Sequence, residues 1–147
     1  RLDEKLERFA IESGLRYTRY VDDMCFSGGE IKKHTLDEIE KIVSSEGFRT
    51  NKSKTHLHAP RSNLKLVTGV NVALGKMSLP KSYKRAISTD LFHIEKYGLR
   101  SHLAKRKIRD PNYIEALVGK VGYWLFIEPE NKRAQHYKQV LAQFVNI

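Results

Sequence analysis

Apolar residues recur at helical spacing in two segments of the first half of the chain. Residues 2–14 carry apolar side chains three and four positions apart and stop at Gly14, a pattern that predicts an amphipathic helix. Residues 36–47 repeat the pattern, and Thr35 followed by Glu38 is typical of the capping box that begins a helix. We therefore expect two helices in this part of the chain.

A strand pattern separates the two helices. Residues 15–21 are rich in Tyr, Thr and Val, and residues 24–27 continue with Met, Cys and Phe, so both segments favour strands. Because only Asp22 and Asp23 lie between these segments, the two strands are expected to form a hairpin with the aspartates at or near its turn.

Two more segments before residue 80 have the composition of strands. Residues 48–58 carry charged side chains at outward positions and are expected to form an edge strand. Residues 64–80 have β-branched residues before Leu74–Gly75. This second segment is expected to form another hairpin that turns at that dipeptide.

The pattern becomes helical after Pro80. Residues 82–98 place apolar side chains along one stripe, and residues 111–128 begin behind Asp110 with a proline at the first helical position. Residues 130–147 follow another proline in the same way. Three amphipathic helices with short connections predict a small bundle.

The expected fold class is α+β, with a change of architecture near residue 80. Residues 1–80 form a lobe of antiparallel hairpins and helices, and residues 81–147 form an all-helical lobe of about three helices. Residues 1–59 carry 11 basic and 11 acidic side chains, whereas the rest of the chain carries 16 and 6. The net charge of +10 therefore lies in the second part and indicates a polyanionic partner; a solvated surface is the alternative.

Composition excludes several classes of protein. A hydrophobic content of 40% with 30% charged residues is that of a folded globular protein. No apolar run reaches the roughly 18 residues needed to cross a bilayer. Cys25 is the single cysteine, which excludes an internal disulfide and favours a reducing compartment. The chain begins with Arg1 inside a predicted helix, and we expect it to be a piece of a longer protein.

Asp22 and Asp23 are the first candidates for chemistry. Adjacent carboxylates repel each other, and YVDD by itself fits three structures. The first is a plain turn, in which aspartates are common. The second is a calcium loop, but it needs further oxygen ligands that residues 24–29 do not supply. The third is a phosphoryl-transfer site, in which two divalent cations offset the repulsion between clustered carboxylates.

Four sequence blocks resemble those of reverse transcriptases, and they follow one another in the same order. RYVDDMCFSG (19–28) resembles the Y-x-D-D hairpin, and GFRTNKSKT (47–55) resembles the family's next motif. LVTGVNV (66–72) takes the place of the primer-grip hairpin, and its V-T-G triplet at residues 67–69 is similar to that of bacterial retron enzymes. ALVGKVGYWLFIEPEN (116–131) is similar to the retron-type thumb.

The resemblance implies an RNA-directed DNA polymerase that extends a primer on an RNA template by two-metal nucleotidyl transfer with Mg²⁺. Residues 1–80 correspond to the C-terminal half of the palm, and residues 81–147 to the thumb. The implied partners are the RNA template, the nascent DNA and deoxynucleoside triphosphates. The resemblance to retron enzymes further implies a role in antiphage defence and a cognate noncoding RNA as a partner. It also implies a location in the bacterial cytoplasm and no membrane partner. The fingers and the N-terminal palm, with a further metal-binding aspartate, are expected outside this chain, which alone is expected to be inactive.

The resemblance also implies roles for single residues near the hairpin. Asp22 is a metal ligand, and Asp23 supports the metal site. Lys54 is the lysine that protonates or neutralises the departing pyrophosphate, and a solvated lysine is the alternative. Tyr20 and Val21 approach the primer terminus or the template pair, and ordinary strand packing is the alternative for Val21.

Other expected contacts are with the nucleic-acid backbone. Thr68, Gly69 and Asn71 fall at the primer-grip position, where a glycine in a strand lets another backbone come close; a bulge without a ligand is the alternative. Trp124 and Phe126 are expected to pack in the core rather than to stack on bases. The candidates for phosphate contacts in the thumb are basic: Lys81, Lys84, Arg85, Lys105, Arg106, Lys107 and Arg109.

A different class of function stays open at this point. In it, the helical lobe is a non-catalytic module that binds structured RNA, and the acidic hairpin is vestigial. Within the polymerase class, a group II intron-type or another bacterial defence reverse transcriptase is the alternative to a retron enzyme. Replacing Asp22 by Asn in the longer protein separates the classes, because an enzyme then loses DNA synthesis and keeps RNA binding.

Overall fold

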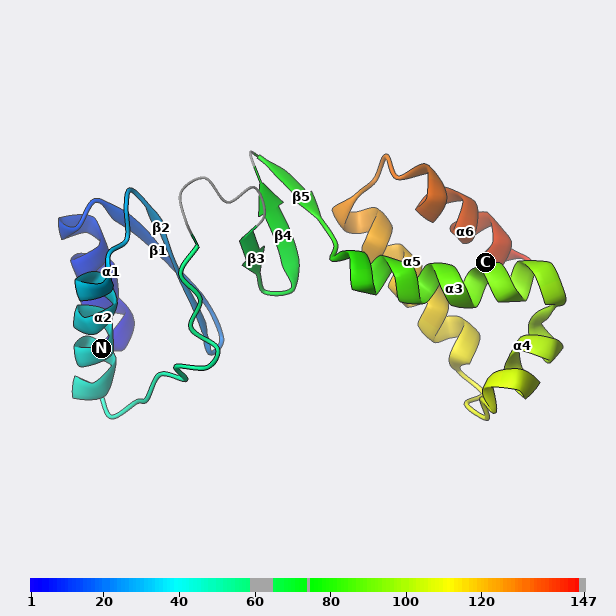
Figure 1. Cartoon of the computed structure of the whole chain (residues 1–147), viewed down its shortest axis with the longest axis horizontal. Coiled ribbons are helices and arrows are strands. Elements are labelled where there is room, and N and C mark those ends of the chain that lie inside the picture. The colour runs from blue at the N-terminus through cyan, green and yellow to red at the C-terminus, as the bar shows by residue number, and fades with distance from the viewer. Residues whose placement is uncertain (59–64, 74, 146–147) are drawn as a thin grey trace. The chain divides into compact units, whose positions relative to one another are not determined.

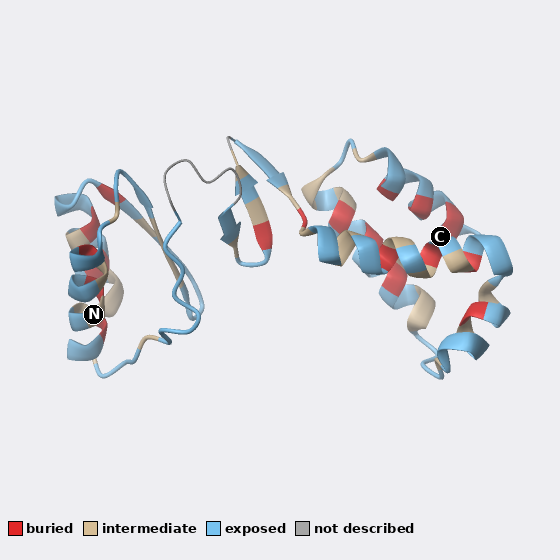
Figure 2. Cartoon of the chain, viewed as in Figure 1, coloured by how far each residue is buried: buried red, intermediate tan, exposed pale blue. Residues whose placement is uncertain are grey.

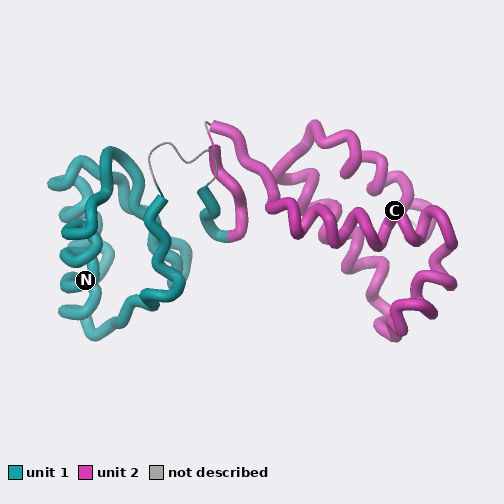
Figure 3. Tube along the Cα trace, in the orientation of Figure 1, with its two compact units in different colours: residues 1–68 teal, residues 69–147 magenta. Residues whose placement is uncertain are grey.

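The structure, a computed structural model, describes residues 1–58, 65–73 and 75–145. It divides into two compact units, residues 1–68 and residues 69–147 (Figures 1 and 3). Helices and short antiparallel strands occur together in the chain, so the expected α+β class is confirmed. Each unit has its own buried core (Figure 2).

The first unit contains a hairpin that packs on two helices. Its elements are α1 (Leu2–Glu12), β1 (Leu15–Tyr20), β2 (Asp23–Gly28) and α2 (Lys33–Ser45). Leu6, Ile39 and Val43 are buried at its centre, and half-buried side chains of the hairpin, such as Tyr17 and Phe26, pack against them. Burying an aliphatic side chain of this size contributes about 1.5–3 kcal/mol, so these contacts hold the hairpin on the helices.

The hairpin and both helices of this unit lie where the sequence predicts them, with two corrections. Val21, predicted in the first strand, lies in the turn, and Asp23 lies in β2. The second correction concerns the start of α2. The helix begins at Lys33, so Thr35 lies inside its first turn rather than in front of it. Thr35 is buried on the same face as Ile39 and Val43, four and eight residues later. Burying this face favours an earlier helix start, and the capping box predicted with Glu38 is therefore wrong.

The edge strand predicted at residues 48–58 is also wrong. The structure describes this whole segment and has a turn at residues 52–54 and no strand. The Asn51 side chain accepts hydrogen bonds from the backbone N–H and the hydroxyl of Ser53 (3.1 and 2.7 Å), and the Lys54 N–H donates to the Asn51 carbonyl (3.0 Å). An asparagine that bonds the backbone two residues later stabilises a turn and competes with strand pairing.

The next three strands form one small sheet in the order β3-β4-β5. They are β3 (Lys65–Val67), β4 (Val70–Ala73) and β5 (Lys76–Ser78). The predicted hairpin turn is confirmed by the register, because Ala73 pairs with Lys76 and leaves a two-residue loop between them; Leu74, the first loop residue, lies outside the described residues. A second turn, which the pattern did not predict, is formed by Thr68 and Gly69.

The rest of the second unit is helical. Its elements are α3 (Lys81–Tyr97), α4 (Leu99–Arg106), α5 (Tyr113–Ile127) and α6 (Lys132–Ala142). Helix α5 packs on α3 and α6, and buried residues gather along these three helices (Figure 2). Leu91, Leu117, Trp124 and Leu141 belong to this core. These three long helices are the predicted ones, but α5 begins after Asn112 and α6 after Asn131, so the predicted helix starts at the two prolines are wrong.

Helix α4 is an additional short helix that the sequence pattern did not indicate. Gly98 separates it from α3 with a φ of +82°, a conformation that glycine adopts readily. His102 is its buried residue, and the His102 Nε2 lies 2.8 Å from the hydroxyl oxygen of Tyr113. A helix with one buried side chain has a weak amphipathic pattern, so contacts with α3 and with Tyr113 at the start of α5, rather than local periodicity, hold it.

The two aromatic residues assigned to the core behave differently. Trp124 is 2% exposed, which confirms the prediction, whereas Phe126 is 80% exposed, so the prediction for Phe126 is wrong. Residues two apart on a helix point about 200° away from each other, and burying Trp124 therefore turns Phe126 outward. None of the described helices is long and apolar enough to cross a membrane.

Candidate active site and nucleic-acid interface

The tip of the β1–β2 hairpin is a two-residue turn. Tyr20 pairs with Asp23, so Val21 and Asp22 form the loop. Val21 has a φ of +54°, which a β-branched residue rarely adopts. The first loop residue has a positive φ and the second does not, which is the pattern of a type II′ turn. Glycine is usual at the first position of such a turn. Backbone strain of this kind costs on the order of 1–3 kcal/mol and is frequent at functional sites.

The two aspartates are exposed at the open side of this hairpin. Side chains alternate across a strand, and Asp23 is opposite Tyr20 on the face that does not carry Tyr17 and Phe26. The Tyr17 and Phe26 rings pack together with centroids 5.0 Å apart and contact the helical core. Asp23 therefore lies on the uncovered face of the hairpin, with Asp22 at its end.

Asp3 of helix α1 fixes the strand that leads to the turn. Its carboxylate accepts a hydrogen bond from the Tyr17 hydroxyl (2.8 Å) and pairs with Arg19 (2.6 Å). Burial, together with the hydrogen bond to Asp3, raises the pKa of Tyr17 to about 12, so the hydroxyl stays a donor. Because Asp3 engages Arg19, the nearest cation on this strand does not neutralise the aspartates of the turn.

The donor chemistry of the hairpin tip fits a divalent cation. Among the ion pairs of the described residues, none includes Asp22 or Asp23, and a cation between two carboxylates offsets their repulsion. The same residues contain no group of three or more His, Cys, Asp or Glu side chains that could hold a metal ion. Mg²⁺ takes one or two carboxylates together with waters and substrate phosphates, so the two aspartates fit as part of a larger site.

The remaining candidates of this region lie in turns or in the small sheet. Lys54 is exposed in the turn after Asn51, and its ammonium is in none of the ion pairs of the described residues. Thr68 and Gly69 have φ values of +45° and +83°, the pattern of a type I′ turn, so Gly69 lies in a turn rather than in a strand. Asn71 is half-buried in β4 and pairs with Ser78.

Two of the seven basic candidates in the helical part form ion pairs with acidic residues of the chain. The Lys84 ammonium lies 2.8 Å from the Glu128 carboxylate, and the two side chains are 24% and 13% exposed. Arg106 pairs with Asp90 at 2.9 Å. The other five are exposed: Lys81, Arg85, Lys105, Lys107 and Arg109.

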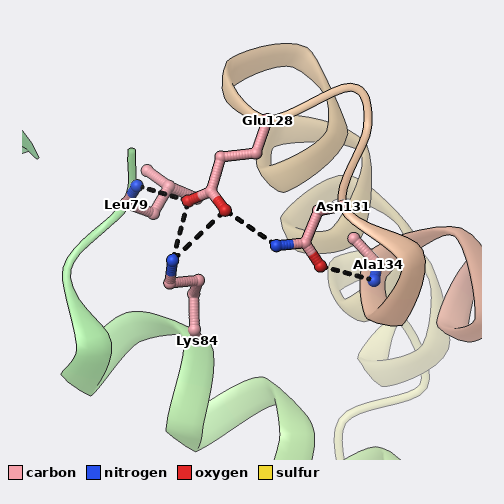
Figure 4. Close-up of polar contacts among 5 residues, drawn as sticks. All are labelled: Leu79, Lys84, Glu128, Asn131 and Ala134. Atoms are coloured by element: carbon pink, nitrogen blue, oxygen red, sulfur yellow. Dashed lines mark hydrogen bonds and ion pairs between the residues drawn. The ribbon is translucent and has the colours of Figure 1, made fainter. Parts of the chain in front are cut away.

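Glu128 connects three segments of the second unit (Figure 4). Its carboxylate accepts hydrogen bonds from the Leu79 N–H, the Lys84 ammonium and the Asn131 amide, each at 2.8 Å. The Asn131 side chain in turn accepts from the N–H of Ala134 (3.2 Å) and caps α6. Burial raises the pKa of Glu128, but the hydrogen bonds from Lys84, Leu79 and Asn131, together with the Trp124 indole N–H, outweigh it and leave the pKa below its ordinary value.

Sequence reasoning named neither Glu128 nor Arg133 as a site residue. The Lys84 and Leu79 partners of Glu128 are 44 and 49 positions away, so no local pattern indicates them. Arg133 begins α6 and lines a groove together with Arg85 of α3, which only the packing of the helices brings about. The paired basic residues at 132–133 are the one signal in the sequence that pointed to this position.

Comparisons with known proteins agree with the resemblance of the sequence blocks. No protein-family model matches the chain. The chain is 34% identical to the Retron Ec86 reverse transcriptase of Escherichia coli over 96 residues, which are 64% of this chain and 30% of that protein. It is 38% identical to the Retron Mx65 reverse transcriptase of Myxococcus xanthus over 76 residues, 49% of this chain and 17% of that protein.

A third relative covers nearly the whole chain. The Retron Mx162 reverse transcriptase of Myxococcus xanthus is 25% identical over 146 residues, which are 91% of this chain and 29% of that protein. The curated relatives of the chain are thus retron reverse transcriptases, and the resemblance is confirmed. The chain spans less than a third of the length of each of these relatives.

Proposed function

We propose that the chain is part of an RNA-directed DNA polymerase of a bacterial retron. The observation that carries the proposal is the pair of exposed carboxylates at a strained two-residue turn, in a chain whose curated relatives are retron reverse transcriptases. Residues 1–80 supply part of the palm, and residues 81–147 supply the thumb. The protein extends a primer with deoxynucleotides on an RNA template.

Asp22 and Asp23 hold Mg²⁺ in this proposal. Bound Mg²⁺ supplies activation of the primer 3′ hydroxyl and neutralisation of the charge on the triphosphate. Asp22 offers a ligand oxygen from the turn itself, and Asp23 supports the site from the uncovered face of β2. Packing of β1 and β2 on the helices fixes both carboxylates, because strands hold a site more rigidly than loops do. A further carboxylate from outside this chain completes the ligand set.

Three side chains near the turn act on the substrates. Lys54 carries a compact ammonium on a flexible stem, which suits neutralisation or protonation of the departing pyrophosphate. Tyr20 and Val21 are 70% and 75% exposed, so the core of this unit does not need them. They contact the primer terminus or the template pair.

The backbone of the nucleic acid is held by the small sheet and by the basic helices. Thr68, Gly69 and Asn71 contact the primer strand, and the open space beside Gly69 lets a sugar–phosphate chain come close. Lys84 and Arg106 contribute to the positive field while their acidic partners hold them. Phosphate contacts come from the exposed members of the set: Lys81, Arg85, Lys105, Lys107 and Arg109.

The same relatives support a proposal for the biological setting. A retron enzyme uses a cognate noncoding RNA as its template, and the concentration of the whole +10 charge in residues 60–147 suits an RNA partner. We place the protein in the bacterial cytoplasm and in defence against phages.

The test is the replacement of Asp22 by Asn in the longer protein that carries this chain. We expect Asp22→Asn to lower primer extension by at least about 100-fold, and Asp23→Asn to lower it less. RNA affinity stays within about threefold, because phosphate contacts by the basic helices dominate it. Glu12→Gln, which removes an exposed carboxylate of α1, is the matched control and keeps full activity. If DNA synthesis by Asp22→Asn equals that of the control, the proposal is wrong and a non-catalytic RNA-binding module is the better function.

A further inference from the structure

Asp3 is an acidic residue of helix α1 that contacts the strand leading to the turn. Its two carboxylate oxygens have different partners. Oδ1 accepts a hydrogen bond from the Tyr17 hydroxyl (2.8 Å), and Oδ2 accepts one from the Arg19 guanidinium (2.6 Å). Both partners belong to β1, so this single carboxylate binds a cation and a neutral donor of the same strand.

Tyr17 holds the Asp3 carboxylate in one orientation. The Tyr17 ring is half-buried and packs on Phe26 with centroids 5.0 Å apart, and both rings contact the buried core of the first unit. A hydrogen bond from an anchored ring fixes the position of Oδ1. Because the two oxygens of a carboxylate lie in one plane, the direction of Oδ2 is fixed as well. Arg19 therefore binds an acceptor whose position depends on the core.

Arg19 is the basic residue of β1 nearest to the turn. Tyr20 and Asp23 form the strand pair that closes the turn, and Arg19 directly precedes Tyr20. Three extended residues span at most about 10–11 Å, so the long, flexible Arg19 side chain can reach Asp22 when nothing holds it. This side chain is 39% exposed, and packing alone does not fix it. Asp3 is its partner among the described residues.

An arginine bound to Asp22 would compete with a divalent cation for the same oxygens. A guanidinium forms two parallel hydrogen bonds with a carboxylate, and it stays protonated at every pH at which the protein is folded. Mg²⁺ needs an ionised carboxylate with a free oxygen. None of the ion pairs of the described residues includes Asp22, which agrees with Arg19 being held elsewhere.

We propose that Asp3 is a positioning residue for the metal site, which acts through Arg19. By binding the guanidinium it keeps Arg19 away from Asp22 and leaves the Asp22 carboxylate free for Mg²⁺. Asp3 is not itself a metal ligand, because Tyr17 and Arg19 occupy its two oxygens. The inference deepens the proposed function and rests on it in one point, the binding of divalent metal by Asp22.

The test is a double-mutant cycle on Asp3 and Arg19 in the longer protein that carries this chain. Asp3→Asn keeps an oxygen that accepts from Tyr17 but removes the charge that holds Arg19. We expect it to raise the Mg²⁺ concentration for half-maximal primer extension about fivefold, the strength of a favourable exposed ion pair. Asp3→Asn/Arg19→Gln removes the competing guanidinium as well and should return this concentration to within about twofold of wild type. The rate at saturating Mg²⁺ stays the same in all variants.

Two further variants separate the charge of Asp3 from its effect on folding. Asp3→Glu keeps the negative charge and should restore the Mg²⁺ requirement of wild type. Glu7→Gln removes an exposed carboxylate from the same helix and is the matched control, with an unchanged Mg²⁺ requirement. Circular dichroism of every variant verifies that the helices remain folded.

Metal binding is also measured without catalysis. Mn²⁺ prefers the same oxygen ligands as Mg²⁺, and the EPR signal of the free ion decreases when it binds. The longer protein is titrated with Mn²⁺ in the absence of substrates, and Asp22→Asn identifies the site by its loss. The Kd of that site for Mn²⁺ should rise about fivefold in Asp3→Asn and return to the wild-type value in Asp3→Asn/Arg19→Gln.

The outcomes separate this inference from the proposed function. If Asp3→Asn has the same effect on the Mg²⁺ requirement with and without Arg19, or no effect at all, the inference is wrong, because Asp3 then does not act through Arg19. Neither result affects the proposed function, which primer extension by Asp22→Asn tests. Conversely, full DNA synthesis by Asp22→Asn overturns the proposed function, whereas the Mn²⁺ titration still decides whether Asp3 controls metal binding at Asp22.

Discussion

At the scale of single residues, Val21 adopts a backbone conformation, and Glu128 carries a charge, that its local surroundings disfavour. Val21 has a positive φ although it is β-branched, and Glu128 stays ionised although its side chain is 13% exposed. The register of the hairpin imposes the first, and hydrogen bonds from distant segments stabilise the second. Substitutions at the two positions therefore have opposite effects on stability.

Val21→Gly is expected to stabilise the chain. Glycine relieves the strain of the positive φ, which exceeds the entropy that glycine loses on folding. The free energy of unfolding should rise by about 1 kcal/mol, measured by urea denaturation followed by circular dichroism. Val72→Gly, the same change in strand β4, is the control and should lower it by about 0.5–1 kcal/mol. Equal destabilisation by both variants would show that the turn is unstrained.

Glu128→Gln is expected to destabilise the helical part by about 1–3 kcal/mol at neutral pH, because Lys84 loses its charged partner. The pKa of Glu128 is lowered in the folded chain, so its contribution is present above the ordinary pKa of a glutamate. That contribution disappears as the pH falls through the folded-state value. Urea denaturation at several pH values should therefore show the difference from wild type shrinking in acid. Glu130→Gln, an exposed neighbour, should show no difference at any pH.

At the scale of elements, local signals determined the positions of most helices and of two hairpin turns, whereas the turn at Thr68 and Gly69 was not predicted. The β1–β2 turn was predictable to within one residue because Asp22 and Asp23 interrupt strand-forming residues, although the loop itself is Val21 and Asp22. The strand predicted at residues 48–58 was not formed because the Asn51 side chain supplies turn hydrogen bonds. Helix α4 was missed because His102 alone is buried in it, and its stability comes from tertiary contact.

Helix α4 gives the second unit a sensitivity to acid. Burial lowers the pKa of His102; Asp90 opposes this effect, while Arg106 and His93 add to it. A histidine whose pKa is lowered in the folded chain binds a proton more tightly in the unfolded chain. Its contribution to stability is thus complete above the ordinary histidine value of about 6.5 and is lost as the pH falls through the folded-state pKa.

The measurement is the free energy of unfolding as a function of pH between neutrality and mild acid. His102→Gln should weaken the loss of stability on acidification, because the titrating group is gone. His34→Gln, which removes an exposed histidine of α2, should leave the pH dependence as it is in wild type. An unchanged pH dependence in His102→Gln would contradict this account.

At the scale of the whole molecule, the sequence revealed the acidic turn and the basic second part, but it did not reveal the groove. Charge counting needs no structure, so the uneven distribution of the +10 charge was evident. The run at 105–109 is the densest basic stretch, yet Arg106 in it is paired with Asp90. Arg85 and Arg133 are far apart in the chain, and only the packing of α3 and α6 places them in one groove.

The separation of charge predicts that nucleic-acid binding does not depend on the aspartates. The double variant Asp22→Asn/Asp23→Asn raises the formal net charge from +10 to +12, so without metal its affinity for RNA should equal or exceed that of wild type by up to about threefold. Fluorescence titration at about 50 and 200 mM salt should give the same salt slope for both, because neither aspartate contacts a phosphate directly. Arg85→Gln, with a smaller slope, is the control in the opposite direction. A loss of affinity of the double variant in EDTA would mean that the turn itself contacts the nucleic acid. The prediction that the second part binds nucleic acid independently of the aspartates would then be wrong.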